Sequence, residues 1–419
     1  MAFLVAAPAA AQIGEGLVVQ PQIPQNSDRG RNLSVEEQPR PDYSPLGARF
    51  GSVIFYPRIE TGAGGTSNTY LRDTGAVSSP FLYIRPSARL VSDWSRHTLQ
   101  LSGTATLRNY LGESARNERL WSVDALGRLD VRSTLAVEGT ASISQVFENQ
   151  FSGEVASSVA ALSRFRRDFG SVQATYTNGR GRGFVTADYT SLRFRPVALI
   201  GGGVRDQTDR NREVTRLTGQ LEYARSPSVS LFGQLSGSQT DYERNLRTGD
   251  PNLDSKAVRL LVGANVDIAG RIRGTFGLGY SIRDYDAAVY DTVRGLSIES
   301  RLQVFPLRRL TVTLAGERTI EDASQARVPF WSTRFNLRGD YEVLRNLIIN
   351  ANADYSRQTY RGIPLSSSVY RAEVGGRYLA SRRVVLRGSL NYSHRSSNDP
   401  QVLAGANEAR VEAGIAYQL

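Results

Sequence analysis

The chain of 419 residues contains no cysteine, which excludes a disulfide scaffold and a thiolate metal site. Its net charge is +11, and because Lys256 is the only lysine, nearly all of the positive charge is arginine. The arginines are spread along the chain, whereas nucleic-acid binding needs a basic patch, so we predict no nucleic-acid partner. No run of eighteen apolar residues follows the N-terminus, which excludes membrane-spanning helices.

The first residues resemble the end of a secretory signal peptide. An apolar stretch closes with Ala9, Ala10 and Ala11, a small-residue cleavage site. We predict a signal peptide over residues 1–11, truncated at its start because the usual basic region is missing; the alternative is a flexible alanine-rich terminus. Residues 12–50 contain several prolines among polar residues and bury little apolar surface, so we expect a disordered periplasmic tail. Its acidic pair Glu36-Glu37 receives no function.

Period-two alternation recurs from about residue 51 to the end. In residues 98–111, Leu99, Leu101 and Leu107 share one face, and polar residues such as Ser102 share the other. Such strands have one apolar face. A chain made of many of them is typical of a transmembrane β-barrel, in which only alternate residues meet lipid.

The connections between these strands alternate between short turns and longer polar loops. Eight short turns and nine long loops predict a closed antiparallel barrel of about eighteen strands over residues 51–419, with sixteen as the alternative. The pattern is weakest over 149–170, where arginines interrupt it. A soluble propeller, β-helix or sandwich would show repeats or shorter strand spacing that the chain lacks. Short turns and both termini are expected in the periplasm, and long loops outside the cell.

The last strand carries the clearest alternation. Its apolar positions predict the signal for barrel assembly and the strand that closes the barrel against the one beginning near Ser52; they are Val411, Ala413, Ile415, Tyr417 and Leu419.

A local likeness extends this interpretation. Residues 81–87 (FLYIRPS) followed by residues 92–97 (SDWSRH) resemble the early hairpin of the bacterial outer-membrane family described as putative β-barrel porin type 2, and the overall pattern covers roughly residues 50–419. The resemblance implies an outer-membrane location and, less directly, an association with exopolysaccharide synthesis and export. It implies no catalytic residue. The chain departs from the commonest outer-membrane ending, because Leu419 replaces a terminal aromatic residue.

Chemistry that would indicate an enzyme is sparse. The two histidines are His97, in a turn beside Asp93 and Ser95, and His394. A short turn is a poor scaffold for a catalytic relay, so we predict no catalytic residue, no cofactor and no enzymatic activity. The acidic residues of 284–291 could bind calcium, but a solvated loop is the preferred interpretation, and we predict no metal site.

Strand parity predicts which charged residues line the lumen. Most opposite charges are expected to pair across neighbouring strands, and the surplus of arginine would favour anions. The predicted pore-lining arginines are Arg85, Arg89, Arg108, Arg273, Arg283, Arg301, Arg334, Arg338, Arg377 and Arg387.

These features predict an outer-membrane pore for polar, anionic solutes or for an exported acidic polysaccharide. The alternative is a non-transport barrel that anchors or organises a cell-surface or exopolysaccharide assembly. Expected partners are outer-membrane lipid, lipopolysaccharide and the barrel-assembly machinery.

Overall fold

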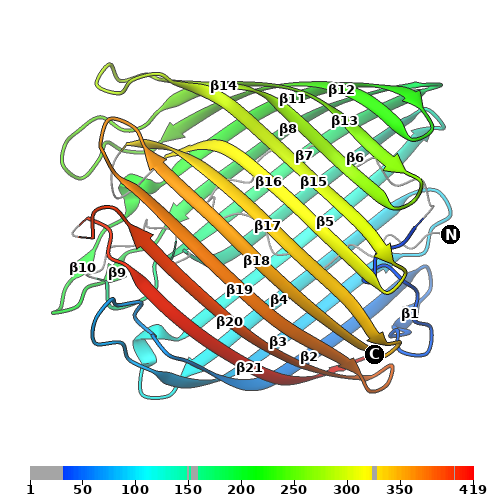
Figure 1. Ribbon diagram of the computed structural model, residues 1–419, viewed down its shortest axis with the longest axis horizontal. Coiled ribbons are helices and arrows are strands. Elements are labelled where there is room, and N and C mark those ends of the chain that lie inside the picture. The colour runs from blue at the N-terminus through cyan, green and yellow to red at the C-terminus, as the bar shows by residue number, and fades with distance from the viewer. Residues whose placement is uncertain (1–31, 149–150, 152–158, 323–327, 401) are drawn as a thin grey trace.

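The structure is a computed structural model that describes residues 32–148, 151, 159–322, 328–400 and 402–419. Its main feature is one antiparallel sheet that closes on itself as a ring of eighteen strands (Figure 1). This confirms the predicted barrel and its strand number. The ring strands are β2 (Val53–Thr66), β3 (Ser79–Ser92), β4 (Thr98–Tyr110), β5 (Glu118–Arg132), β6 (Leu135–Phe147), β7 (Arg164–Asn178), β8 (Gly181–Phe194), β11 (Arg212–Ser226), β12 (Val229–Tyr242), β13 (Ser255–Ile268), β14 (Ile272–Tyr285), β15 (Val293–Leu307), β16 (Leu310–Asp322), β17 (Pro329–Leu344), β18 (Leu347–Tyr360), β19 (Ser366–Leu379), β20 (Val384–Ser397) and β21 (Ala406–Gln418).

The alternation of residue types along each strand separates the two faces of the wall. In β14, Phe276 and Leu278 are exposed on the outer surface, whereas Thr275 and Ser281 are buried on the inner side. Successive side chains of a strand point to opposite faces, so this alternation gives the barrel an apolar outside and a polar inside.

The ring closes between its last and first strands. β21 pairs with β2 in an antiparallel register that runs from Arg58 opposite Gln418 to Thr66 opposite Arg410. This pairing agrees with the predicted closing seam. It leaves no strand edge with unpaired backbone groups, which a hydrocarbon environment would not tolerate.

The connections divide the barrel into two ends. We call the end with the eight turns, for example 227–228 and 308–309, the short-turn end, and the other the long-loop end. Figure 1 shows the long-loop end on the left and the C-terminus at the opposite end. The turn between β7 and β8 contains Gly179 with φ of +56°, a conformation that glycine adopts without strain.

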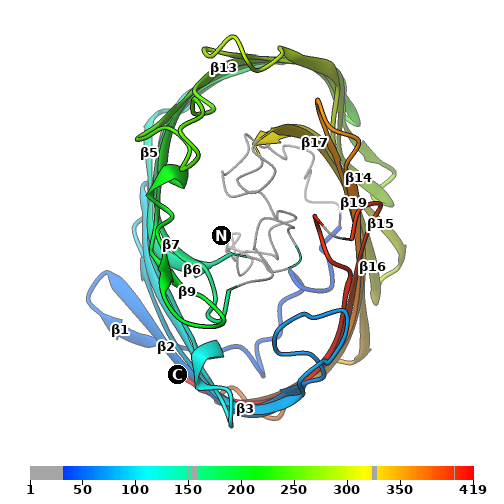
Figure 2. The ribbon, with the colours of Figure 1, turned by 90° about the vertical axis from the view of Figure 1, so that its left-hand side faces the viewer.

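A few short elements lie outside the ring. β1 (Ala48–Phe50) pairs only with β2 and projects from the wall, as Figure 2 shows. β9 (Val197–Ala198) and β10 (Val204–Arg205) form a small hairpin in a long loop. The 3₁₀ turns η1 (Ser114–Arg116) and η3 (Thr208–Arg210) lie in the loops that precede β5 and β11. Among the described residues, no helix has the length and apolar character needed to cross a membrane.

The described residues before β1 lie inside the outline of the barrel (Figure 2). Residues 32–50 belong to the predicted disordered tail, yet residues 32–45 contact the inner wall at the short-turn end. Residues 1–31, which contain the predicted signal peptide, lie outside the described residues.

Candidate functional site

The inner wall of the barrel is the candidate site. All ten arginines predicted to line the lumen lie at inward positions of their strands, in phase with the buried polar residues. Arg89 stacks over the Tyr56 ring on the neighbouring strand, with 4.9 Å between its guanidinium carbon and the ring centre. Most of the others are best described by the carboxylates that surround them, because a charge at a partly buried wall is stable only with compensation.

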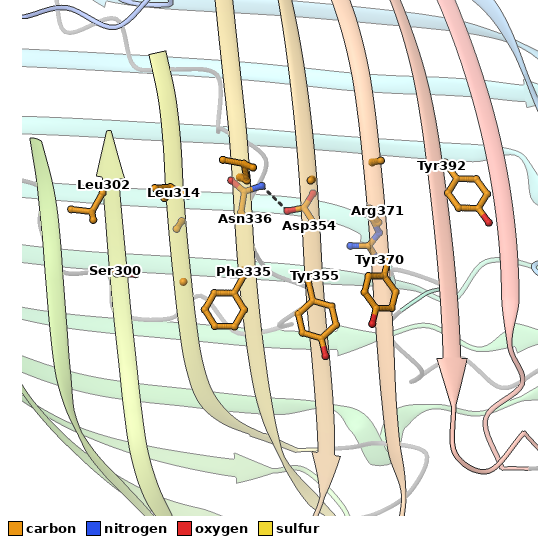
Figure 3. Close-up of a pocket in the computed structure, with 15 residues that line it drawn as sticks. Ser300, Leu302, Leu314, Phe335, Asn336, Asp354, Tyr355, Tyr370, Arg371 and Tyr392 are labelled. Carbon is orange, nitrogen blue, oxygen red and sulfur yellow. Dashed lines mark hydrogen bonds between the residues drawn. The ribbon is translucent and has the colours of Figure 1, made fainter. Parts of the chain in front are cut away.

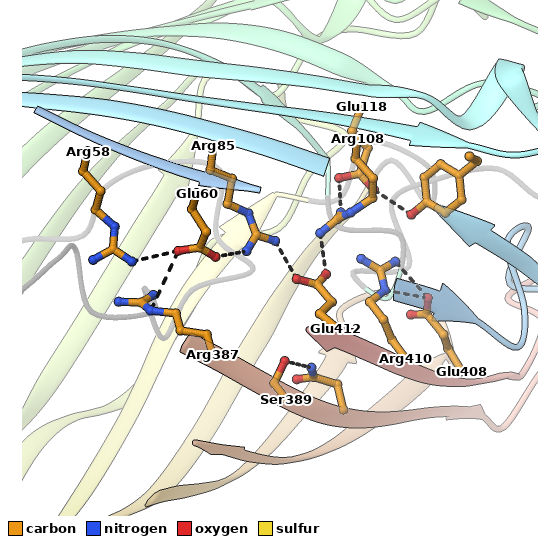
Figure 4. A network of polar contacts seen from close by, with 12 residues as sticks. Arg58, Glu60, Arg85, Arg108, Glu118, Arg387, Ser389, Glu408, Arg410 and Glu412 are labelled. Atoms are coloured by element: carbon orange, nitrogen blue, oxygen red, sulfur yellow. Dashed lines mark hydrogen bonds and ion pairs between the residues drawn. The ribbon is translucent and has the colours of Figure 1, made fainter. Parts of the chain in front are cut away.

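A chain of ion pairs crosses the closing seam (Figure 4). Glu60 on β2 accepts hydrogen bonds from Arg58, at 2.9 Å, and from Arg85, at 3.2 Å. Arg85 also reaches Glu412 on β21 at 2.6 Å, and Glu412 receives Arg108 of β4 at the same distance. The network continues from Arg108 to Glu118 of β5 and includes Arg387 of β20, 3.8 Å from Glu60. It therefore joins six neighbouring strands on both sides of the seam.

A second group of ion pairs lies towards the long-loop end. Asp322 receives Arg283 at 2.9 Å and the Tyr285 hydroxyl at 2.7 Å. Arg334 pairs with Glu317, at 3.6 Å, and with Glu321. The contacts of Arg334 join the adjacent strands β16 and β17, as predicted for opposite charges, whereas the pair of Arg283 and Asp322 reaches across β15.

The N-terminal residues 32–45, which we call the docked segment, add carboxylates from inside the lumen. Arg377 donates to Glu36 at 2.6 Å, and Arg338 lies 3.6 Å from the other oxygen of that carboxylate. Arg273 donates to Glu37 at 2.6 Å. The sequence analysis gave Glu36 and Glu37 no role, although they bring two adjacent negative charges to an arginine-rich lumen.

Further contacts fix the docked segment to the wall. Val35 is fully buried, and its backbone N–H donates to the Thr311 hydroxyl at 2.9 Å. The segment also supplies a positive charge to the wall. Arg40 pairs with Glu342 of β17 at 2.6 Å and donates to the carbonyl oxygen of Arg345. Buried ion pairs and hydrogen bonds therefore hold a segment that buries little apolar surface.

The turn that presents Glu37 is itself capped. The backbone N–H and hydroxyl of Ser34 donate to Glu37 Oε2 at 2.8 and 2.7 Å, and the Glu37 N–H donates in return to the Ser34 hydroxyl oxygen at 3.4 Å and to the Ser34 carbonyl. This is the pattern of a capping box. Burial alone would raise the pKa of the Glu37 carboxyl, but the hydrogen bonds from Ser34 and Arg273 hold it below its ordinary value.

Arg301 and Arg377, like Arg89, form no ion pair with a carboxylate of the wall among the described residues. Within the described part of the chain, Arg377 forms an ion pair with Glu36 alone, and Arg301 forms none. The Nε–H groups of both are buried without a hydrogen-bond acceptor. At the short-turn end, the positive charges of Arg301 and Arg377 therefore exceed what the carboxylates of the wall balance.

A groove of about 430 Å³ lies on the outer face of the wall (Figure 3). Phe335, Tyr355, Tyr370 and Tyr392 border it at outward positions; Tyr355 is half-buried and the other three are exposed. The Tyr355 and Tyr370 rings lie 5.0 Å apart. Outward aromatic residues of this kind form the interfacial girdles of membrane barrels, so the groove faces lipid and takes no part in the lumen.

The other residues considered for chemistry have structural contacts. The His97 ring accepts a hydrogen bond from the backbone N–H of Asp130 at 3.2 Å, and Asp93 pairs with Arg49. His394 contacts Asn407. In the described ranges, no group of three or more histidine, aspartate or glutamate residues could hold a metal ion.

Comparison with known proteins identifies relatives of this barrel. The model of a family described as Putative beta-barrel porin 2 matches residues 40–419. No curated protein matches the chain.

Solved structures with a similar fold include OpdL of Pseudomonas aeruginosa, at 13% identity and a TM-score of 0.45, where the match covers 88% of this chain and 99% of the other. OccAB3 of Acinetobacter baumannii is 10% identical with a TM-score of 0.46 and coverages of 88% and 100%. The siderophore receptor PirA of Pseudomonas aeruginosa is 10% identical with a TM-score of 0.44 and coverages of 90% and 81%.

Proposed function

The chain belongs to the family described as Putative beta-barrel porin 2, and from this premise we propose that it forms a pore that favours anionic solutes. The family and the closed ring of strands make it a porin-like outer-membrane barrel. The anion preference is supported by one observation above all: Arg301 and Arg377 line the short-turn end without a carboxylate of the wall. Fixed positive charges along a pore attract anions and repel cations.

The proposal includes an orientation. We place the short-turn end and both termini in the periplasm, and the long-loop end outside the cell, because bacterial barrels have tight periplasmic turns and longer extracellular loops. The docked segment then lies at the periplasmic mouth.

An exported acidic polysaccharide is the second solute class that the wall suits. A carboxylated sugar chain would present one charge after another to arginines on successive strands, and arginine binds carboxylates with a planar pair of N–H groups. The partners expected for this role are lipid and lipopolysaccharide on the outer face. The barrel-assembly machinery is expected to recognise β21 through its apolar positions Val411, Ala413, Ile415, Tyr417 and Leu419.

Conductance of the purified protein in planar bilayers tests the pore. Stable single-channel steps in 1 M potassium chloride are the expected result. Membranes that contain folded, heat-modifiable protein and remain silent would reject the pore and favour a barrel that anchors or organises a surface assembly.

A further inference from the structure

Four arginines surround the carboxylates of the docked segment. Arg273, Arg301, Arg338 and Arg377 lie on the inner faces of β14, β15, β17 and β19, in the half of the barrel near the short turns. We call them the arginine cluster. Glu36 bridges Arg377 and Arg338, and Glu37 contacts Arg273. The charges that act on Arg301 are those of Arg338 and Glu37.

The arginine cluster has N–H donors that the two carboxylates of the docked segment do not reach. Arg301 has no ion pair in the described part of the chain, and the Nε–H groups of Arg301 and Arg377 lie buried without an acceptor. A buried donor without a partner is costly, so such groups mark a place where an acceptor would bind favourably. One wall carboxylate competes for the cluster, because Asp340 accepts three hydrogen bonds from Arg338 at 2.8, 2.9 and 3.0 Å.

The carboxylates of the docked segment remain reachable from the lumen. The side chains of Glu36 and Glu37 are 34% and 42% exposed, whereas that of Arg273 is 8% exposed. A soluble ligand can therefore approach the arginines by replacing Glu36 and Glu37, without any change in the wall.

We propose that the arginine cluster is a binding site for soluble polycarboxylates, and that Glu36 and Glu37 occupy it as a tethered competitor. A polycarboxylate that reaches the short-turn end exchanges with the two side chains and releases the docked segment from this part of the lumen. Tethering keeps the competitor at a high local concentration, so a ligand binds only when it is multivalent or abundant. The solute would then itself clear the mouth of the pore.

Citrate serves as a tricarboxylate probe of this site. Its affinity for the purified full-length chain is measured by titration calorimetry at pH 7 and low salt. Glu36→Gln with Glu37→Gln removes the competitor and keeps the side-chain size, so citrate should bind about ten-fold more tightly or better than to the native chain, in proportion to the fraction of free sites. The further changes Arg301→Gln and Arg377→Gln should abolish this gain.

Asp42→Asn is the matched control. Asp42 belongs to the same segment, is exposed and forms no ion pair in the described ranges, so the loss of its single charge should leave citrate affinity unchanged. Equal affinity of the Glu36→Gln, Glu37→Gln chain and the native chain would overturn the proposal. So would an equal gain in Asp42→Asn.

A measurement on the native chain does not depend on how the variants fold. A glutamyl endopeptidase can cut after Glu36 or Glu37 only when the docked segment leaves the wall. Millimolar citrate should increase the cleavage rate several-fold, and an equal concentration of chloride should not. An unchanged rate would overturn the proposal. The inference rests on the proposed anion-favouring pore, but neither assay uses conduction: a chain that binds citrate as expected yet prefers cations would overturn the selectivity and keep the site.

Discussion

At the scale of single residues, the two faces of one strand differ most clearly at neighbouring positions. Leu390, halfway along β20, is 58% exposed on the outer face, and Ser389 lies beside the ion pairs of the inner face (Figure 4). Leu390→Arg should lower the free energy of unfolding by about 2–4 kcal/mol, the cost of arginine near the bilayer midplane. Ser389→Arg should cost much less. Urea denaturation in lipid vesicles gives both values, and equal costs would refute the assignment of faces.

Glu412 is the carboxylate on which the seam network depends most, because it receives both Arg85 and Arg108 at 2.6 Å. Glu412→Gln should lower the free energy of unfolding by about 3 kcal/mol, since Arg85 and the buried Arg108 each lose one of their two carboxylate partners. Glu138→Gln is the control, because Glu138 is 39% exposed and lies 3.8 Å from Arg128; it should cost less than about 1 kcal/mol. The same denaturation series compares them, and similar losses for both would mean that the seam network adds no stability.

Docking of the N-terminal residues should depend on pH through Glu37. Its pKa is lower when it is docked than when it is free, so docking is strongest above the free pKa of about 4.3 and weakens as the pH falls through the docked value. Hydrogen exchange of residues 32–45, corrected for the intrinsic rates, should therefore rise between about pH 5 and pH 3. Asp42→Asn should keep this transition. Protection that is constant over the range would exclude a role of the Glu37 charge.

Much of the residue-scale picture could be predicted from the sequence, and part of it could not. Alternation alone assigned all ten pore arginines to inward positions, because neighbouring side chains in a strand point to opposite faces. It could not give their partners. Whether Arg85 meets Glu60, Glu412 or neither depends on the register between strands, which the pattern of a single strand leaves open.

At the scale of elements, the closing seam between β2 and β21 is crowded on its inner side. A Cβ added to Gly62 would lie 2.2 Å from the backbone oxygen of Ala413 and 2.6 Å from the Tyr83 ring. Backbone cannot yield as a flexible side chain can, so Gly62→Ala should cost about 1–3 kcal/mol and reduce the yield of folded barrel. Gly127→Ala, where a Cβ meets nothing within 4 Å, should fold normally. Heat-modifiable migration on gels measures the yield, and equal yields would show that the seam tolerates a methyl group.

Strand β7 and residues 32–45 are the two segments whose structure was difficult to predict from the sequence. Arg164 and Arg166 interrupt the alternation because they are the first outward residues of β7, at the long-loop end, where Arg166 pairs with Asp168. Residues 32–45 looked disordered because their composition buries little apolar surface. Composition does not account for a segment enclosed by a charged wall, where ion pairs such as Arg40 with Glu342 supply the contacts.

At the scale of the whole molecule, strands that each carry a simple alternation of polar and apolar residues pair into a closed antiparallel ring with a polar lumen. The wall pairs many of its inner charges, and near the short turns the docked segment supplies carboxylates to Arg377, Arg338 and Arg273. Architecture was predictable because both the alternation and the rhythm of turns and loops repeat many times. The docking of residues 32–45 inside the lumen was less predictable, because it depends on contacts with strands more than two hundred positions away in the chain.

The measurement that tests this account most directly is the reversal potential of single pores across a gradient of potassium chloride. The native pore should be anion-selective, and Arg301→Gln with Arg377→Gln should shift the reversal potential towards the cation side. The preference should weaken as salt rises, because the Debye length falls from about 10 Å at 0.1 M to about 3 Å at 1 M. Arg166→Gln, which removes an outward arginine of β7 that is paired with Asp168, should leave the reversal potential unchanged. A cation-selective native pore, or a reversal potential that does not respond to the loss of Arg301 and Arg377, would contradict the account.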